Sequence, residues 1–354
     1  MSSLRKTSPR GLEDQALRPS QSARLYAALD AAQAPFPLAE NVQAQWEPET
    51  GAFRSEWESV FAGAAFAAYQ QSYAYGEAVN AAGGKILRAR IISDDSLVGF
   101  AQAVRHMTYP FLPAIHVMRG PVWARPDLSR VVKLAAAQAL HQSAPAKGPH
   151  AVLITPAEGD DFEGSDFKQI YTGSHTSLLD LSRDEEALRA GLDGKWRNRL
   201  NAAEKADITV MRLGRDRAKY AWLLDKDATL MRSIGHRSSN VVLVPAYQSI
   251  AGKKSVLAFE AKSGAERIGG MLFVIHGDGA TYHIGWSNET GKSLNAQNRI
   301  MWLAIRELKK LGVRTLDLGG VDTQNMPGVA RFKLGLGGAV VSTSGSWTRG
   351  PKWG

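Results

Sequence analysis

The order of secondary-structure elements, which occurs twice along the chain, restricts the fold more than any other feature. Each half shows helical spacing, then a hairpin, a strand, a helix and a final strand. The main segments are residues 55–69, 85–92, 97–106, 127–140 and 151–156, and then 222–234, 256–262, 267–276, 280–287, 294–311 and 313–318. Such a mixture of hairpins and helices is typical of α+β proteins. We therefore expect an α+β architecture built twice, with mixed sheets and flanking helices.

The length and composition agree with two soluble domains. A chain of 354 residues is long for a single hydrophobic core. We expect domains at residues 24–175 and 176–342, with a disordered basic tail at 1–23 and a C-terminal tail at 343–354. The absence of cysteine excludes disulfides, thiolate metal sites and thiol nucleophiles. The chain has no apolar run of membrane-spanning length and no secretory signal, which favours a cytoplasmic protein.

The charge distribution indicates a polyanionic partner. A net charge of +9 suits a nucleic acid, a phosphorylated metabolite or an anionic membrane face. The densest cations are Lys195, Arg197, Arg199, Lys205, Arg212, Arg215, Arg217 and Lys219. Lys195 and Arg199 lie near one face of a helix that we expect to run on from Asp184, and Trp196 lies beside them. Such a face can hold phosphates and stack a base, and a solvated helical face is the alternative.

Residues 313–341 form the leading candidate site. A buried strand ends at Gly319-Gly320, where the backbone can take a positive φ or approach a ligand closely. A polar loop then leads to Phe332-Lys333 and a glycine-rich return. Lys333 is either the cation of a site or a surface lysine at the end of a tight loop. We expect Asp317 to accept backbone N–H groups of the glycines rather than to act as a base.

Other residues carry weaker signals. Arg237, beside His236 at the end of helix 222–234, could bind phosphate or carboxylate, or could simply complement the helix dipole. The chain lacks a P-loop, a GxGxxG turn and a GxSxG elbow. Its histidines show no metal-ligand spacing, so we expect neither a metal nor a cofactor. We expect His276 and His283, which flank a hairpin turn, to lie at the surface.

Several segments together resemble a known family. DLGG at 317–320, a polar loop and FKxxxGG from Phe332 form one pattern, and SLLDLS at 177–182 with KWRNRLNAAEK from Lys195 forms another. A third is HIGWSNETGKSLNAQNRIMWLAIRELKKLG from His283, and weaker echoes are Gln71-Ser72, Tyr75-Gly76 and Arg119-Gly120-Pro121. These segments, within about residues 65–345, resemble the Fem family. Its members are aminoacyl-tRNA-dependent peptidyl transferases that build peptidoglycan cross-bridges in cell wall biogenesis.

The resemblance implies two tandem GNAT-like (acyl-CoA N-acyltransferase-like) domains of the short type, without the coiled-coil arm of long members. It also implies an aminoacyltransferase in which an amine attacks the ester carbonyl of an aminoacyl-tRNA. Lys333 would be the catalytic cation at the oxyanion and at the tRNA acceptor end. The implied substrate-binding residues are Arg237, which would grip the diphosphate of the acceptor, and Phe332, Tyr75, Gly319 and Gly320. The implied tRNA-binding residues are Lys195, Arg197 and Arg199.

The implied partners are aminoacyl-tRNA as donor and a peptide or peptidoglycan precursor as acceptor, with transient contact with the inner membrane face. One departure affects the acceptor, because the family's short members have a lysine where this chain has Glu77 or its neighbours. Lys85 or Arg119 would have to replace that lysine.

Two other hypotheses remain at this stage. The first is an acyl-CoA-dependent GNAT N-acyltransferase acting on a cell-envelope or polysaccharide precursor, although residues 287–297 lack the pyrophosphate-binding loop that it needs. The second is a non-catalytic protein that binds tRNA or a membrane surface.

Overall fold

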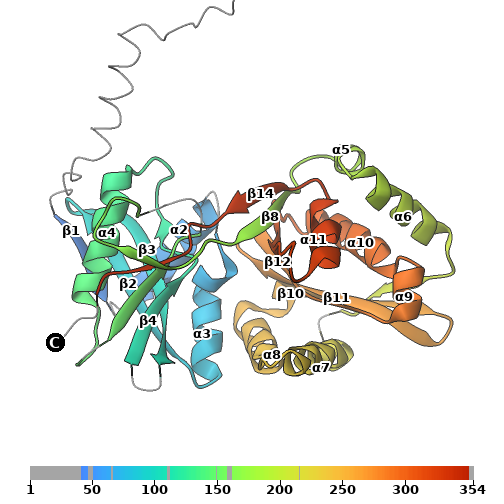
Figure 1. Ribbon diagram of the computed structural model, residues 1–354, viewed down its shortest axis with the longest axis horizontal. Helices are drawn as coiled ribbons and strands as arrows, with labels where there is room; N and C mark the ends of the chain where they lie inside the picture. Colours follow the sequence, from blue (N-terminus) through green and yellow to red (C-terminus); the bar gives the residue numbers. More distant parts are fainter. Residues whose placement is uncertain are drawn as a thin grey trace, which may run out of the picture. The chain divides into compact units, whose positions relative to one another are not determined.

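The protein forms two mixed β-sheets with flanking helices, which confirms the predicted α+β class (Figure 1). The computed structural model describes residues 41–46, 51–64, 67–109, 112–148, 150–157, 162–214 and 216–350. The disordered tail predicted at 1–23 lies outside these ranges. No helix within them is long and apolar enough to cross a membrane.

The first sheet has the strand order β1-β2-β3-β4-β6-β15-β7, with β5 paired to β3. Its strands are β1 (Val42–Trp46), β2 (Lys85–Ser93), β3 (Ser96–Tyr109), β4 (Leu112–Met118), β5 (Val122–Trp123), β6 (Ala151–Thr155), β7 (Lys168–Tyr171) and β15 (Ser346–Thr348). Its helical segments are α2 (Gly51–Gly63), η1 (Tyr69–Gln71), α3 (Tyr73–Ala81) and α4 (Arg130–Ser143). β4 and β6 pair in parallel, and α4 lies in the crossover between them, as a parallel pair requires.

The second sheet has the order β14-β8-β13-β12-β11-β10-β9. Its strands are β8 (His175–Asp180), β9 (Thr209–Arg212), β10 (Val256–Ser263), β11 (Glu266–His276), β12 (Gly279–Ser287), β13 (Thr315–Gly320) and β14 (Ala339–Ser342). Its helical segments are α5 (Glu185–Ala190), α6 (Gly194–Lys205), α7 (Arg217–Ser233), α8 (Asn240–Ala251), η2 (Lys253–Ser255), α9 (Glu289–Ser293), α10 (Ala296–Lys310) and α11 (Pro327–Leu334). The parallel pair is β12–β13, joined through α9 and α10, so both sheets contain the same hairpin and crossover.

The two parallel pairs differ in length. β4 and β6 pair from Ala114–Met118 against Ala151–Thr155, whereas β12 and β13 pair only at Gly279–Thr281 against Thr315–Asp317. Beyond Asp317 the register of β13 with its other neighbour, β8, shifts before Gly320 lies opposite Thr176. The ends of β12 and β13 therefore separate within a sheet that is otherwise continuous.

The helix α10 anchors the core of the second sheet. Its buried residues follow helical spacing and pack with strands β10 and β11 and with α6: Ile300, Met301, Ala304, Ile305 and Leu308. The chain leaves this helix through Gly312, at φ 83°, and enters β13. Packing of α10 thus fixes the position of the strand that carries Asp317, Gly319 and Gly320.

The predicted continuous helix from Asp184 through the basic segment is wrong. Asp184 does begin a helix, since its side chain accepts the N–H of Ala187, but α5 ends at Ala190. Asp193 then begins α6 by accepting the N–H groups of Lys195 and Trp196. The structure also has a short helix, α11, within the segment predicted to be a polar loop before Phe332, and Pro327 in its first turn is a favourable start.

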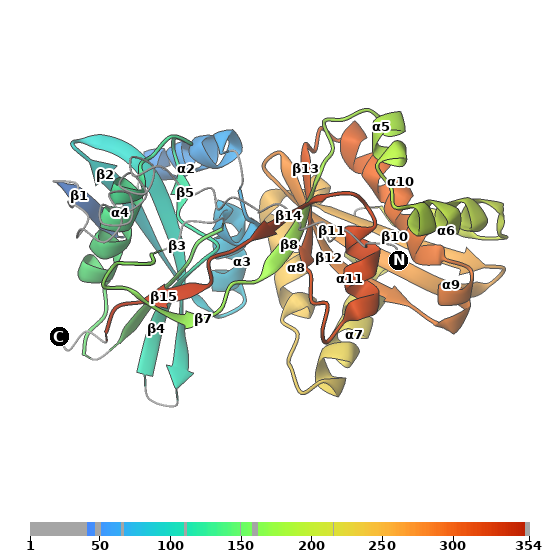
Figure 2. The same ribbon diagram turned by 45° about the horizontal axis from the view of Figure 1, so that its top comes forward.

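Part of the predicted C-terminal tail is a strand of the first sheet. Trp347 in β15 lies opposite Ile154 of β6, and its side chain packs on Phe162 while only 8% exposed. Figure 2 shows β14 in the second sheet and β15 in the first, both in red. We propose that the two domains divide near residue 175, where the chain passes from β7 to β8.

A buried polar network connects α3 to strands β2 and β3. Gln71 donates its amide to the carbonyls of Gln102 and Met118, at 2.9 and 2.8 Å. Arg88 Nε donates to Gln102 Oε1 at 3.0 Å, and its Nη2 pairs with Glu77 at 2.7 Å. Because Arg88 is only 3% exposed, this pairing compensates a charge that the burial would otherwise make unfavourable.

We predict that Gly76→Ala destabilises the protein by roughly 1–3 kcal/mol, even though alanine is the better helix former. An added Cβ would lie 2.1 Å from Gln102 Oε1 and 2.6 Å from Arg88 Nη2. Urea unfolding measures the free energy of unfolding. The control is Gly63→Ala in α2, where no atom lies within 4 Å of the added Cβ. Equal stabilities for the two variants would contradict the described network.

Candidate active site

The side chain of Lys333 lies at the place where β12 and β13 separate. It projects from α11, and its Nζ donates a hydrogen bond to the carbonyl of Gly320 at 2.8 Å. The Nζ also lies 5.8 Å from the ring centroid of Tyr282 on β12. Gly319 has φ +72°, and a Cβ added there would lie 3.5 Å from the Nζ. The structure thus brings together three residues predicted for the site: Lys333, Gly319 and Gly320.

Burial and charge act in opposite directions on Lys333. Burial disfavours the ammonium and lowers the pKa of Lys333 below its ordinary value, while the nearby Asp317 carboxylate partly restores it. A cation in this position is partly desolvated, is bonded to β13 and lies near the ring of Tyr282 on β12. It is therefore a stronger hydrogen-bond donor to a developing negative charge than a solvated lysine would be.

Asp317 accepts three hydrogen bonds through its buried carboxylate. Its Oδ1 accepts from the N–H of Gly319 at 2.8 Å and from Thr176 Oγ1 at 2.5 Å. Its Oδ2 pairs with Arg119 Nη1 at 2.7 Å. Burial alone would favour the neutral acid, but Arg119 and these donors hold the pKa of Asp317 below its ordinary value. The predicted hydrogen bond from the glycine backbone to Asp317 is confirmed. The ion pair of Asp317 with Arg119 of the first domain was not among the predicted contacts.

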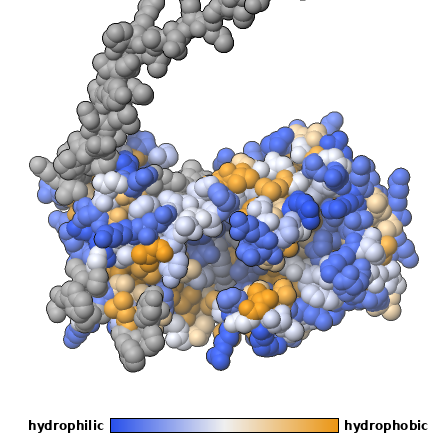
Figure 3. All heavy atoms as spheres, viewed as in Figure 1, coloured by the Kyte–Doolittle hydropathy of each residue, from blue (hydrophilic) through white to orange (hydrophobic). Residues whose placement is uncertain are grey.

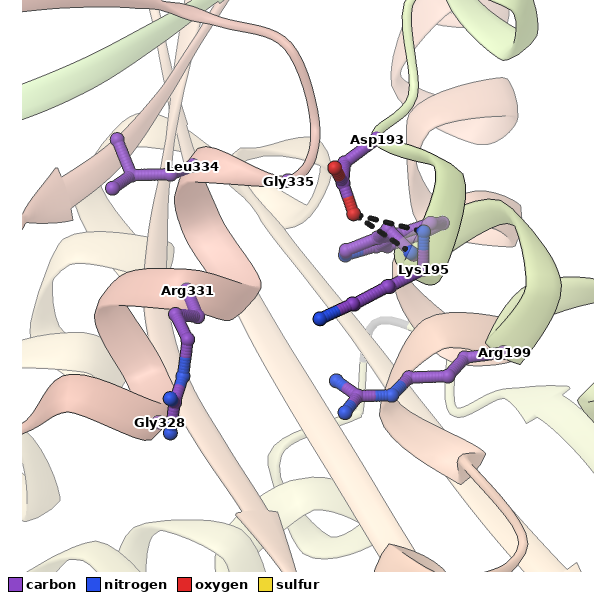
Figure 4. A pocket seen from close by; sticks show the side chains of 8 residues that line it. Asp193, Lys195, Arg199, Gly328, Arg331, Leu334 and Gly335 are labelled. Atoms are coloured by element: carbon purple, nitrogen blue, oxygen red, sulfur yellow. Dashed lines mark hydrogen bonds between the residues drawn. The ribbon is translucent and has the colours of Figure 1, made fainter.

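A groove rich in cations, about 660 Å³ in volume, lies on the other side of α11. Lys195 and Arg199 from α6 point into the gap between the helices, and Arg331 from α11 lies opposite (Figure 4). Among the described residues, none of the three has a carboxylate within ion-pair distance. The carboxylate of Asp193 also lines the groove, but it caps α6, as the dashed lines show. We call this the cation groove.

Arg197 is separated from the other predicted tRNA-binding residues. Its Nη2 donates to the carbonyls of Leu192 at 3.0 Å and Ala190 at 3.4 Å, at the end of α5. Arg197 and Arg199, two arginines on the same helix, therefore have different surroundings. Arg199 lines the groove, whereas Arg197 donates to backbone carbonyls. Arg331 was not among the predicted residues, because α11 was not expected.

Close contact between α6 and α11 shapes the cation groove. The indole N–H of Trp196 donates to the carbonyl of Phe332 at 3.1 Å, and the two rings lie 5.8 Å apart. Gly335 permits this contact, because a Cβ there would lie 2.8 Å from Trp196 Cδ1. The ring of Phe332 lines a second groove of about 500 Å³ together with Tyr282 and Val329. Arg199 and Gly328 line both grooves, which are therefore adjacent.

Tyr75 and Arg237 lie away from Lys333. Tyr75 in α3 contacts Tyr69 with ring centroids 4.9 Å apart, and burial raises the pKa of Tyr75. Arg237 is exposed in the turn between α7 and α8. The ring of His283 lies 5.7 Å from that of Tyr69, and its Nε2 is 2.9 Å from Asn240 Oδ1 at the start of α8. A chain of contacts thus leads from Tyr75 to the helix that follows Arg237.

The predicted surface placement of His276 and His283 is wrong. His276 is 5% exposed, and burial lowers the pKa of each imidazole to about 4. The rings of Phe61 and Tyr69 lie 6.2 and 5.8 Å from that of His276, so the first domain covers this side chain although Gly277 in the turn itself is exposed. Within the described ranges, no group of three or more His, Asp or Glu residues is close enough to hold a metal ion.

The arrangement of β12, α10, β13 and α11 can be compared with known proteins. Residues 251–352 match the FemAB family. The predicted Fem resemblance is thereby confirmed over a range that contains Tyr282, Asp317, Gly319, Gly320 and Lys333. The cation groove residues of α6, together with Arg237 and Tyr75, lie outside the range matched by the FemAB family. No curated protein sequence matches this chain.

Solved structures establish the fold. FemX has 14% sequence identity and a TM-score of 0.65, covering 86% of this chain and 97% of its own. A tandem GNAT protein from the clavulanic acid biosynthesis pathway has 11% identity and a TM-score of 0.53, covering 88% and 100%. The C-terminal domain of a protein named Putative Lysylphosphatidylglycerol Synthetase, from Agrobacterium fabrum, has 10% identity and a TM-score of 0.50, covering 85% of this chain and 92% of its own. At these identities the likeness concerns the fold, and it confirms the tandem GNAT-like prediction.

We predict that Arg199→Ala weakens the binding of a tRNA acceptor-stem minihelix and makes its salt dependence shallower, because a phosphate contact is lost. The slope of log affinity against log salt should fall by about one for each contact. Fluorescence anisotropy at several salt concentrations measures both quantities. Arg197→Ala is the matched control and should leave the slope unchanged. Equal effects of the two substitutions would contradict the separate placement of their side chains.

Proposed function

We propose that the protein is an aminoacyltransferase that moves an amino acid from aminoacyl-tRNA to an amine of a peptide or peptidoglycan precursor. The observation that carries this proposal is the position of Lys333, between the separated ends of β12 and β13 on one side of α11. The cation groove lies on the other side of the same helix. One short helix therefore connects a candidate oxyanion donor with a candidate phosphate-binding surface.

In the proposed reaction, the acceptor nitrogen attacks the carbonyl carbon of the aminoacyl ester. A C–N bond forms and the carbonyl oxygen becomes an oxyanion, which Lys333 stabilises by a hydrogen bond in place of the one to Gly320. The C–O bond to the terminal ribose then breaks, and the proton lost by the amine passes to the ribose oxygen. We assign no general base, since the ester is already activated and water can carry the proton.

The donor assignment is supported by unpaired charge in the cation groove. Lys195, Arg199 and Arg331 can each contact a phosphate of the acceptor end. In the segment where a pyrophosphate loop would be needed for acyl-CoA, Asn288 instead accepts the N–H of Gly291 at 2.8 Å. A Cβ on Gly291 would lie 2.0 Å from the carbonyl of Ile268, so this glycine serves packing on β11. These contacts favour tRNA over CoA.

On the acceptor side, the exposed guanidinium of Arg237 is the proposed group for an anionic part of the precursor. Apolar side chains are exposed on either side of Arg237 in the sequence: Leu230 in α7 (47%), Ile234 just after α7 (56%) and Val242 in α8 (53%). They suit a transient contact with the inner membrane face. In Figure 3 apolar residues form small separate patches on a face that is mostly hydrophilic. The reaction is placed in the cytoplasm, where charged tRNA is available.

Two features change the expectations for the first domain. Glu77 is paired with Arg88, so its charge is compensated rather than left to repel a phosphate. Arg119 pairs with Asp317 and is therefore a poor substitute for the missing lysine. Lys85, exposed at the start of β2, remains the candidate for that role.

The experiment that tests the function compares donors. Purified protein is incubated with radiolabelled aminoacyl-tRNA pools or acyl-CoAs, together with peptidoglycan precursors, and amide products are followed by chromatography. The proposal expects label transfer from tRNA. Transfer from acyl-CoA alone would favour the second hypothesis, an N-acyltransferase of the kind suggested by the tandem GNAT neighbour.

We predict that Lys333→Met lowers the turnover number by roughly 10²-fold or more, because the oxyanion loses its donor. Single-turnover rates with saturating aminoacyl-tRNA measure this effect. The control is Lys310→Met, which removes an exposed lysine that pairs with Glu307 on α10. Unchanged turnover in Lys333→Met, or an equal loss in both variants, would remove Lys333 from the mechanism.

A further inference from the structure

The Arg119–Asp317 ion pair connects the first domain, just after β4, with β13 beside the candidate site. The side chains are 19% and 6% exposed, and the residues are 198 positions apart in the sequence. Arg119 has φ 52°, in the left-handed region, so its backbone conformation is constrained as well. Two desolvated charges in such a position are not explained by stability alone, since buried ion pairs often contribute little net free energy.

The bonds of Asp317 lead directly to Lys333. Its Oδ1 accepts the N–H of Gly319, which holds that residue in its left-handed turn. The turn places the carbonyl of the following residue, Gly320, 2.8 Å from the Lys333 Nζ. The Asp317 carboxylate also favours the charged form of Lys333 against the effect of burial. One side chain thus acts on both the position and the charge of the proposed catalytic group.

We propose that Asp317 is a positioning residue for Lys333, and that Arg119 completes this arrangement from the first domain. The site of the second sheet would then depend on a residue of the first. The proposal rests on the role of Lys333 in the proposed function. It deepens that function by assigning a contribution of the first domain to the chemistry of the second.

The other groups near Asp317 and Lys333 do not provide the same control. His276 on β11 interacts with both Asp317 and Arg119, but burial lowers its pKa to about 4, so it is neutral near pH 7. Tyr282 on β12 faces the Lys333 Nζ, and burial raises the pKa of its hydroxyl, so it also stays neutral. Asp317 is therefore the charge that acts on Lys333 from the neighbouring strand, and Arg119 of the first domain is connected to Lys333 through its ion pair with Asp317.

The test measures the reactivity of the Lys333 amine without using any substrate. The full-length protein is acetylated with trace acetic anhydride across a pH series, and mass spectrometry compares Lys333 with Lys310 in the same molecule. Asp317→Asn should make Lys333 react severalfold faster near neutral pH, because loss of the carboxylate favours the neutral amine and loosens the Gly320 carbonyl. The corresponding transfer reaction should lose turnover by roughly 10²-fold, with little change in KM for the donor.

Glu260→Gln is the matched control for loss of a buried, paired carboxylate. Glu260 on β10 is 2% exposed and pairs with Arg267 and Lys262. This variant should be destabilised without any change in Lys333 reactivity. If Asp317→Asn alone fails to fold, the double variant Arg119→Gln with Asp317→Asn removes both charges and can be measured instead.

Two outcomes would overturn the proposal. One is unchanged Lys333 reactivity in the folded Asp317 variant, and the other is an equal change in Glu260→Gln. A reactivity change specific to Asp317, combined with normal transfer by Lys333→Met, would support the positioning effect while rejecting the proposed function of Lys333. The acetylation and transfer results therefore test the two proposals separately.

Discussion

The early end of the β12–β13 pairing is the constraint on which the candidate site depends. Parallel neighbouring strands normally form backbone hydrogen bonds along their whole length. β4 and β6 do so from Ala114–Met118 against Ala151–Thr155. In the second sheet the parallel pairing stops at Asp317, and the carboxylate of that residue accepts the N–H of Gly319. The carbonyl of Gly320 is then available to Lys333. The end of the strand pairing thus leaves a place where the partly buried ammonium of Lys333 binds the backbone.

The helix α11 gives the site its two sides. Lys333 faces the ends of the strands, whereas Arg331 faces α6 across the cation groove and Phe332 contacts Trp196 between them. Within its eight residues the helix places a partly buried lysine on one side and the exposed Arg331 on the other. Because the helix is held by the Trp196 bond and by close packing at Gly335, its two faces keep a fixed relation. A donor whose phosphates and ester carbonyl lie a few bonds apart matches this arrangement.

Sequence patterns predicted the long elements well. Periodicity and turn residues identified the hairpin of β2 and β3, the strands β10 to β12 and the helix α10, whose buried face follows helical spacing. Motif resemblance brought Lys333, Gly319 and Gly320 together. It could not show the Arg119–Asp317 pair, whose members are 198 residues apart, nor separate Arg199 from Arg197 on one helix. Those distinctions arise from tertiary contacts that local patterns do not contain.

The most direct test of the account is a structure of the protein with a stable analogue of the donor, an amide-linked aminoacyl oligonucleotide that ends in CCA. The account predicts that the analogue's carbonyl oxygen lies within hydrogen-bond distance of the Lys333 Nζ, near the Gly320 carbonyl. It also predicts that phosphates of the oligonucleotide lie in the cation groove beside Lys195, Arg199 and Arg331. A well-occupied analogue bound away from α11, with Lys333 unengaged, would contradict the proposed role of this helix.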